Sequence, residues 1–129
     1  MPLRRLDHLL VLTDDLEATR AFYCDVLGLE VGERPPIEFP GYWLTLDGIP
    51  CVHLAERQPY DAWVARLGLE VGPAPIDHVA FAGSDYEELA ERLEAAGVEA
   101  VLNTVPGVLR QLFVTDPNGL RIEVNVPTE

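Results

Sequence analysis

The sequence predicts an α+β fold built from two tandem βαβββ modules, and an internal repeat is the main reason. Leu6-Asp7-His8-Leu9 recurs 70 residues later as Ile76-Asp77-His78-Val79. The same offset relates Val52-His53-Leu54 to Ile122-Glu123-Val124. The order of expected elements is also the same in both halves. The chain is therefore expected to consist of two similar modules, each with one metal-competent side chain near its start and one near its end.

The first half of the chain reads as a strand, a helix and three further strands. The apolar segment Arg4–Leu12 is expected to be a strand buried on both faces. Thr13 or Asp14 can cap a helix that runs to about Leu27, where Gly28 provides the stop. Turns at Pro35-Pro36, Pro40-Gly41 and Asp47-Gly48 separate the three strands, which are Leu29–Arg34, Gly41–Leu46 and Cys51–Ala55.

The second half repeats this order. Asp77–Ala82 is expected to be a strand, and Ser84–Ala96 a helix that ends at Gly97. A tight turn at Asp116-Pro117-Asn118-Gly119 precedes the last of three strands, which are Val98–Thr104, Val108–Thr115 and Leu120–Val126. Between the halves, Gln58–Pro75 is expected to be a linker with a short helix around Tyr60–Gly68.

Length and charge limit the class of protein. The 129 residues suit a single domain, with module one at about 1–57, a linker at about 58–75 and module two at about 76–129. Acidic residues outnumber basic ones 22 to 9, a net charge of −13, which argues against nucleic acid and anionic membranes as partners. No apolar run is long enough for a membrane span, and the start lacks the pattern of a signal peptide. A cytoplasmic protein with a small-molecule partner is expected.

Four side chains are candidate metal ligands: His8, His53, His78 and Glu123. Neutral imidazole and carboxylate bind Zn²⁺, Ni²⁺, Co²⁺, Mn²⁺ or Fe²⁺, and strands present them in fixed directions. All three histidines of the chain belong to this set, in pairs related by the repeat. A lone His or Glu in an apolar strand is more often a hydrogen-bonded structural residue. Arg110 or Arg121 could also neutralise the carboxylate of Glu123, but one bound divalent metal ion is the favoured counter-charge.

Several segments resemble the vicinal oxygen chelate superfamily, which includes glyoxalase I, extradiol dioxygenases and bleomycin-resistance proteins. The resemblance implies paired βαβββ modules that form a curved mixed sheet around a metal cleft, usually in a homodimer. His8, His78 and Glu123 fall where the superfamily keeps two histidines and one glutamate. The matching segments are Leu6-Asp-His-Leu, Asp15-Leu-Glu-Ala-Thr-Arg-Ala-Phe-Tyr, Val26-Leu-Gly-Leu, Cys51-Val-His-Leu, Ile76-Asp-His-Val-Ala-Phe and Gln111-Leu-Phe-Val-Thr-Asp-Pro-Asn-Gly-Leu-Arg-Ile-Glu-Val.

The resemblance leaves three functional classes open. A glyoxalase-like lyase or isomerase would use Glu123 as a metal-bound carboxylate that moves a proton, while His53 stands where such enzymes carry Glu or Gln. An extradiol-type dioxygenase would bind Fe²⁺ through His8, His78 and Glu123. His53 would then occupy a metal position that such enzymes leave free, or act as an acid–base group. The alternative is a non-catalytic protein that binds a drug or antibiotic and confers resistance. Glu123 and His53 are therefore the expected catalytic residues.

Three further residues are expected to contact the substrate. Trp43 lies in an aromatic segment before the strand that carries His53, and could form the wall of a pocket for an apolar substrate. Arg110 and Gln111 lie on the strand that precedes Glu123, and could bind a carboxylate or a carbonyl group. Trp43 is equally suited to the core, and Arg110 to a surface ion pair.

Overall fold

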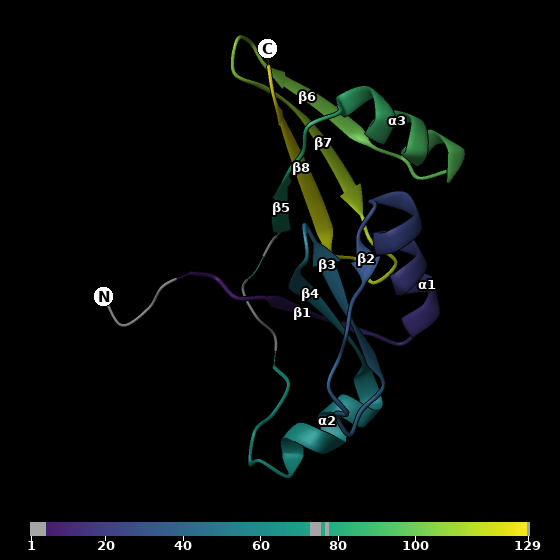
Figure 1. The fold of residues 1–129 in the computed structure, drawn as a ribbon, viewed down its shortest axis with the longest axis vertical. Helices are drawn as coiled ribbons and strands as arrows, with labels where there is room; N and C mark the ends of the chain where they lie inside the picture. Colours follow the sequence, from purple (N-terminus) through teal and green to yellow (C-terminus); the bar gives the residue numbers. More distant parts are fainter. Residues whose placement is uncertain (1–4, 73–75, 77, 129) are drawn as a thin grey trace. The chain divides into compact units, whose positions relative to one another are not determined.

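A computed structural model describes residues 5–72, 76 and 78–128 of the chain. The chain divides into two compact units, residues 1–72 and residues 73–129, and each unit contains one βαβββ module (Figure 1). Each module forms its own four-stranded mixed sheet. The predicted α+β fold of two tandem modules is therefore confirmed.

The first unit contains four strands and two α-helices. Its sheet has the order β1-β4-β3-β2, with β1 parallel to β4 and the other pairs antiparallel. The elements are β1 (Leu9–Thr13), α1 (Leu16–Ala21), a π-helical segment (Phe22–Val26), β2 (Glu30–Val31), β3 (Gly41–Leu46), β4 (Ile49–Glu56) and α2 (Arg57–Ala65).

The second unit repeats this topology. The order of its sheet is β5-β8-β7-β6, and again the first and last strands of the module are parallel neighbours. None of the helices in the described part of the chain is long and apolar enough to cross a bilayer. The elements are β5 (His78–Ala82), α3 (Tyr86–Ala95), β6 (Val101–Val105), β7 (Leu109–Thr115) and β8 (Arg121–Pro127).

The two crossover helices start in the same way. The side chain of Asp15 accepts the backbone N–H of Ala18 at 3.0 Å, and that of Asp85 accepts the N–H of Glu88 at 3.1 Å. An aspartate N-cap satisfies a backbone donor that the first helical turn leaves open. The prediction that Thr13 or Asp14 caps the first helix is wrong, because Thr13 ends β1 and its hydroxyl accepts the N–H of Asp15 instead.

Several element boundaries differ from the predictions. β1 starts at Leu9, so His8 lies just before the strand; Arg4 and Asp77 lie outside the described residues. β2 is only two residues long, because only Glu30 and Val31 pair with β3. β6 starts at Val101 rather than Val98. The linker helix starts at Arg57, directly after β4, and therefore belongs to the first unit.

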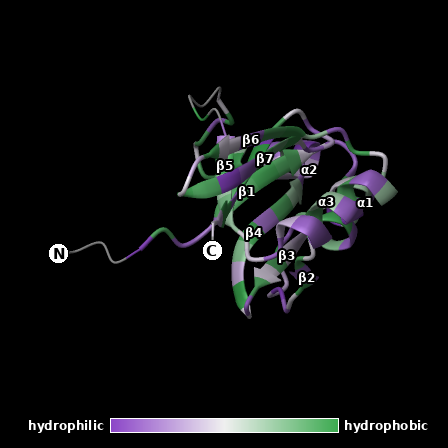
Figure 2. Ribbon diagram, turned by 90° about the horizontal axis from the view of Figure 1, so that it is seen from above, coloured by the Kyte–Doolittle hydropathy of each residue, from purple (hydrophilic) through white to green (hydrophobic). Residues whose placement is uncertain are grey.

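Strand alternation separates an apolar face from a polar one. In β8 the side chains of Ile122, Val124 and Val126 are buried, whereas those of Glu123 and Asn125 are only partly buried. Figure 2 shows hydrophobic residues concentrated on the strands, while α1 and α3 carry hydrophilic bands. Glu123 and Asn125, on the polar face of β8, are thus available to form a site.

The turn between β3 and β4 is the predicted Asp-Gly hairpin. Asp47 has a φ of 51° and Gly48 a φ of 75°. Two successive positive φ values are typical of a type I′ turn, whose twist matches that of the flanking strands. The register shifts between Leu44 and Leu46, and beyond this shift Trp43 lies opposite His53.

Candidate metal centre

The four predicted ligands lie in two pairs, one in each unit. His8 and His53 belong to the first unit, and His78 and Glu123 belong to the second. Each pair joins the start of a module to its last strand, because these two strands are parallel neighbours. Among the described residues, no three His, Cys, Asp or Glu side chains come close enough to hold a metal together. The four-ligand centre therefore remains a prediction.

The pair in the second unit has the geometry of two neighbouring ligands. His78 is the first residue of β5, and Glu123 lies in the adjacent strand β8. His78 Nε2 lies 3.7 Å from Glu123 Oε1, which is longer than a hydrogen bond. Two donor atoms that each lie about 2.1 Å from one ion can be this far apart. The side chain of Glu123 is 15% exposed and that of His78 is 42% exposed.

His8 is oriented by its neighbour in the sequence. Its Nδ1 lies 2.8 Å from Asp7 Oδ2. A carboxylate only accepts hydrogen bonds, so Nδ1 carries the proton and the lone pair lies on Nε2. This hydrogen bond also holds the pKa of Asp7 below its usual value. A carboxylate bonded to the second nitrogen is the common arrangement around a metal-binding histidine, so His8 fits a ligand role.

His53 lies in a stack of three rings. Its ring is 3.9 Å from that of His8 at an angle of 12°, and 4.3 Å from that of Trp43 at an angle of 9°. His53 Nε2 lies 2.9 Å from the carbonyl oxygen of Pro50, so Nε2 is the donor and Nδ1 has the lone pair.

This stacking limits how His8 and His53 can share a metal. An imidazole lone pair lies in the plane of its ring, and the two rings are nearly parallel. An ion in the plane of the His8 ring would lie outside the plane of the His53 ring. Joint coordination therefore requires one ring to rotate. Burial, followed by the nearby charge of His8, also lowers the pKa of His53 and favours its neutral form.

The three predicted substrate contacts lie in different surroundings. Trp43 is half-buried against His53, so its ring is part of the stack. Gln111 lies on the same face of the second sheet as Glu123, because Gln111 pairs with Asn125 and Phe113 pairs with Glu123. Arg110 points to the opposite face, where it lies 3.8 Å from the centre of the Tyr86 ring and pairs with Glu87 at 2.9 Å. Arg110 and Glu123 therefore do not lie on one face.

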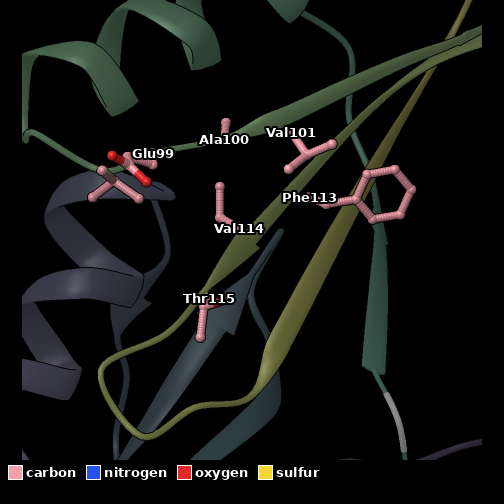
Figure 3. Close-up of a pocket in the computed structure, with 7 residues that line it drawn as sticks. Glu99, Ala100, Val101, Phe113, Val114 and Thr115 are labelled. Atoms are coloured by element: carbon pink, nitrogen blue, oxygen red, sulfur yellow. The ribbon is translucent and has the colours of Figure 1, made fainter.

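A hollow of about 720 Å³ lies beside the first residues of β6 and the last residues of β7. Phe113 and Val114 project to opposite sides of β7 there (Figure 3). Among the described residues that line it, only Glu99 is ionisable and none is a predicted ligand. The lining residues are Val98, Glu99, Ala100, Val101, Phe113, Val114 and Thr115.

Residues 5–124 match the family described as the Glyoxalase/Bleomycin resistance protein/Dioxygenase superfamily. The chain belongs to this superfamily. A curated relative, the glutathione transferase FosA of Serratia marcescens, is 31% identical over 127 residues, which is 96% of this chain and 82% of FosA.

Solved structures of the superfamily share the fold at lower identity. The lactoylglutathione lyase of Agrobacterium tumefaciens is 24% identical, with a TM-score of 0.73 over 98% of this chain and 96% of its own. A mutant form of the fosfomycin resistance protein FosX of Listeria monocytogenes is 20% identical, with a TM-score of 0.72 over 98% of this chain and 94% of its own. That FosX structure is a complex with Mn(II) and a dihydroxypropylphosphonic acid. These likenesses support the superfamily fold.

Two features of this superfamily member were missed from the sequence. Asp7 orients His8, and Asn125 donates to Glu123 at 2.7 Å. Both had a signal: Asp7 precedes the histidine within the repeated segment, and Asn125 lies two residues after Glu123, on the same strand face.

Proposed function

We propose that the chain is a divalent-metal-dependent enzyme whose small substrate binds the metal through oxygen atoms. The observation that carries this proposal is the pairing of His78 Nε2 with Glu123 Oε1 at 3.7 Å on adjacent strands. His8 supports it, because Asp7 leaves Nε2 as the metal-competent nitrogen of that ring. A bound ion would polarise a substrate carbonyl or hydroxyl group and stabilise negative charge on its oxygen.

Within this proposal, His8, His78 and Glu123 are the three metal ligands, supplied by one chain or by two. His53 is better suited to contact the substrate than to be a fourth ligand, because its ring is stacked on His8. With Nε2 hydrogen-bonded to Pro50, its Nδ1 can accept a proton from a substrate group. Glu123 stays the second candidate for proton transfer. The metal is one of Fe, Mn, Zn, Ni or Co.

The charges of the chain argue for recognition through the metal rather than through salt bridges. Most arginines of the described chain are already paired with a carboxylate of the same unit, so a strongly anionic substrate would have to compete with that partner. These paired arginines are Arg5, Arg20, Arg57, Arg66, Arg92 and Arg110. Gln111 remains a proposed substrate contact, because its face of the sheet is that of Glu123.

The reaction class is proposed from the relatives. FosA, the relative at 31% identity, is a glutathione transferase, which makes transfer of a thiol to a small molecule one candidate. The other candidate reactions are lyase or isomerase chemistry and extradiol-type ring cleavage. All three need a substrate that binds the metal through its oxygen atoms and is polarised by it.

The first experiment is metal analysis of untagged protein by inductively coupled plasma mass spectrometry, purified without added metal or chelator. We expect about one equivalent of metal per chain, and His8→Ala or Glu123→Ala should lose it while the protein stays folded by circular dichroism. Glu91→Ala, which removes an exposed carboxylate on α3, is the matched control. Full metal content in both ligand variants would refute the ligand assignment.

Assays of the metal-loaded protein then separate the classes. Hemithioacetal turnover without oxygen indicates a lyase, oxygen uptake with a catechol indicates a dioxygenase, and thiol loss with an electrophile indicates a transferase. Wild-type protein that takes up no metal on titration would refute the enzyme proposal and leave a small-molecule-binding or antibiotic-resistance protein.

We also propose a homodimer, as the family resemblance implies. Light scattering during size-exclusion chromatography should give twice the chain mass of 14.3 kDa. A mass of 14.3 kDa across the micromolar range would refute it.

A further inference from the structure

A row of three amide side chains crosses the second sheet and ends on Glu123. Asn103 on β6 lies opposite Gln111 on β7, and Gln111 lies opposite Asn125 on β8. Asn103 Nδ2 donates to Gln111 Oε1 at 2.7 Å, and Gln111 Nε2 donates to Asn125 Oδ1 at 3.0 Å. Asn125 Nδ2 then donates to Glu123 Oε2 at 2.7 Å. Side chains from three neighbouring strands thus form one hydrogen-bonded series.

The carboxylate determines the direction of this series. A carboxylate accepts and does not donate, so Asn125 must turn its NH₂ group toward Glu123. Its oxygen then faces Gln111, which must donate to it, and Gln111 in turn accepts from Asn103. The orientation of each amide therefore follows from the charge at the end of the row.

The amide row leaves the two carboxylate oxygens of Glu123 in different surroundings. Oε2 is held by Asn125, whereas Oε1 is the oxygen that lies 3.7 Å from His78 Nε2. Because Asn125 holds Oε2, a metal ion beside His78 would be bound by Oε1 alone. A freely rotating carboxylate could instead turn both oxygens toward the ion.

We propose that Asn125, Gln111 and Asn103 are positioning residues that orient Glu123 for monodentate metal binding through Oε1. This inference rests on the proposed metal-dependent function. The hydrogen bonds of the row end on Glu123, so the proposed effect of the amides on the metal passes through that carboxylate. A metal-ligating carboxylate is commonly held by hydrogen bonds from outside the coordination sphere, and the loss of such a bond typically weakens metal binding about 10–100-fold.

Position along the row predicts a graded effect on Mn²⁺ affinity, measured by isothermal titration of the full-length chain. Asn125→Leu removes the donor to Glu123 and should weaken binding about 10–100-fold. Gln111→Met breaks the next bond and should have a smaller effect, and Asn103→Leu the smallest. Thr104→Val is the matched control, because Thr104 neighbours Asn103 on β6 and pairs with Arg110, on the opposite face. It should bind Mn²⁺ as the wild type does.

A spectroscopic measurement separates positioning from general support of the sheet. In Asn125→Leu, Glu123 Oε2 is released and can join the metal, which raises the coordination number. The visible absorption of the Co²⁺-loaded protein becomes weaker as the coordination number rises, so its intensity should fall in this variant and remain unchanged in Thr104→Val. A purely structural role would lower the urea midpoint without changing this spectrum.

The outcomes distinguish this inference from the proposed function. Wild-type protein that binds neither Mn²⁺ nor Co²⁺ would overturn both. Wild-type affinity and spectrum in folded Asn125→Leu would overturn the positioning role alone. If Asn125→Leu does not fold, Gln111→Met decides, because it breaks the row without touching Glu123 or its donor.

Discussion

Replacing His53 decides whether this residue is a metal ligand or a stacked neighbour of one. His53→Phe keeps a flat ring between His8 and Trp43 but removes both nitrogens, whereas His53→Ala removes the ring as well. If the stacked arrangement is the functional one, His53→Phe should keep metal affinity close to that of the wild type, because the lone pair of His8 Nε2 is untouched.

The two variants should differ in stability. Each ring–ring contact contributes about 0.5–1.5 kcal/mol, and the hydrogen bond to the Pro50 carbonyl contributes about 0.5–1.5 kcal/mol. His53→Ala loses two ring contacts and the hydrogen bond, so the free energy of unfolding should fall by about 1.5–4.5 kcal/mol. His53→Phe loses only the hydrogen bond, so about 1 kcal/mol is expected.

Urea denaturation of metal-free protein measures the stability, and titration with Mn²⁺ measures the affinity. Tryptophan fluorescence, to which Trp43 and Trp63 both contribute, reports partly on the stack, because the Trp43 ring lies on His53. A loss of Mn²⁺ affinity in folded His53→Phe as large as that in His8→Ala would refute the argument. It would mean that the His53 ring rotates out of the stack and binds the metal, as the four-ligand prediction requires.

Three further predictions concern the surroundings of the site. The pKa of His53 is lower in the folded than in the unfolded chain, so its neutral form stabilises the fold above the unfolded pKa of about 6.5, and this contribution is lost as the pH falls. In urea denaturation, the free energy of unfolding of the wild type should therefore fall more than that of His53→Phe between about pH 7.5 and 5. Equal losses would contradict this. Arg110→Met should destabilise the second unit by about 0.5–1 kcal/mol through loss of the Tyr86 contact and leave Mn²⁺ affinity and KM unchanged, and a raised KM would instead support Arg110 as a substrate contact. Asp15→Ala removes the N-cap of α1 and should lower the free energy of unfolding by about 1 kcal/mol in urea denaturation. Asp14→Ala, at one of the two cap positions predicted from the sequence, should lower it less.

The repeat and the strand patterns were sufficient to predict both modules, because alternation and turn residues are local signals. The Asp47-Gly48 hairpin and the position of β3 were predicted from such signals and confirmed. Element ends were predicted less well. The N-cap of α1 is Asp15 rather than Thr13 or Asp14, because the Thr13 hydroxyl accepts the N–H of Asp15. β2 is shorter than predicted, because only two of its residues pair with β3. Neighbouring side chains compete for the same backbone group, and the residue pattern does not show which of them forms the hydrogen bond.

The sequence by itself determined the fold class and which four side chains are candidate ligands, because both follow from spacing along the chain. Only the tertiary structure showed what surrounds each candidate. It placed Asp7 on His8, stacked His53 between two rings and turned Arg110 away from the face of Glu123. It also joined amides from three strands into a row that ends on Glu123. These contacts depend on strand register and side-chain direction, which are set when the sheets form.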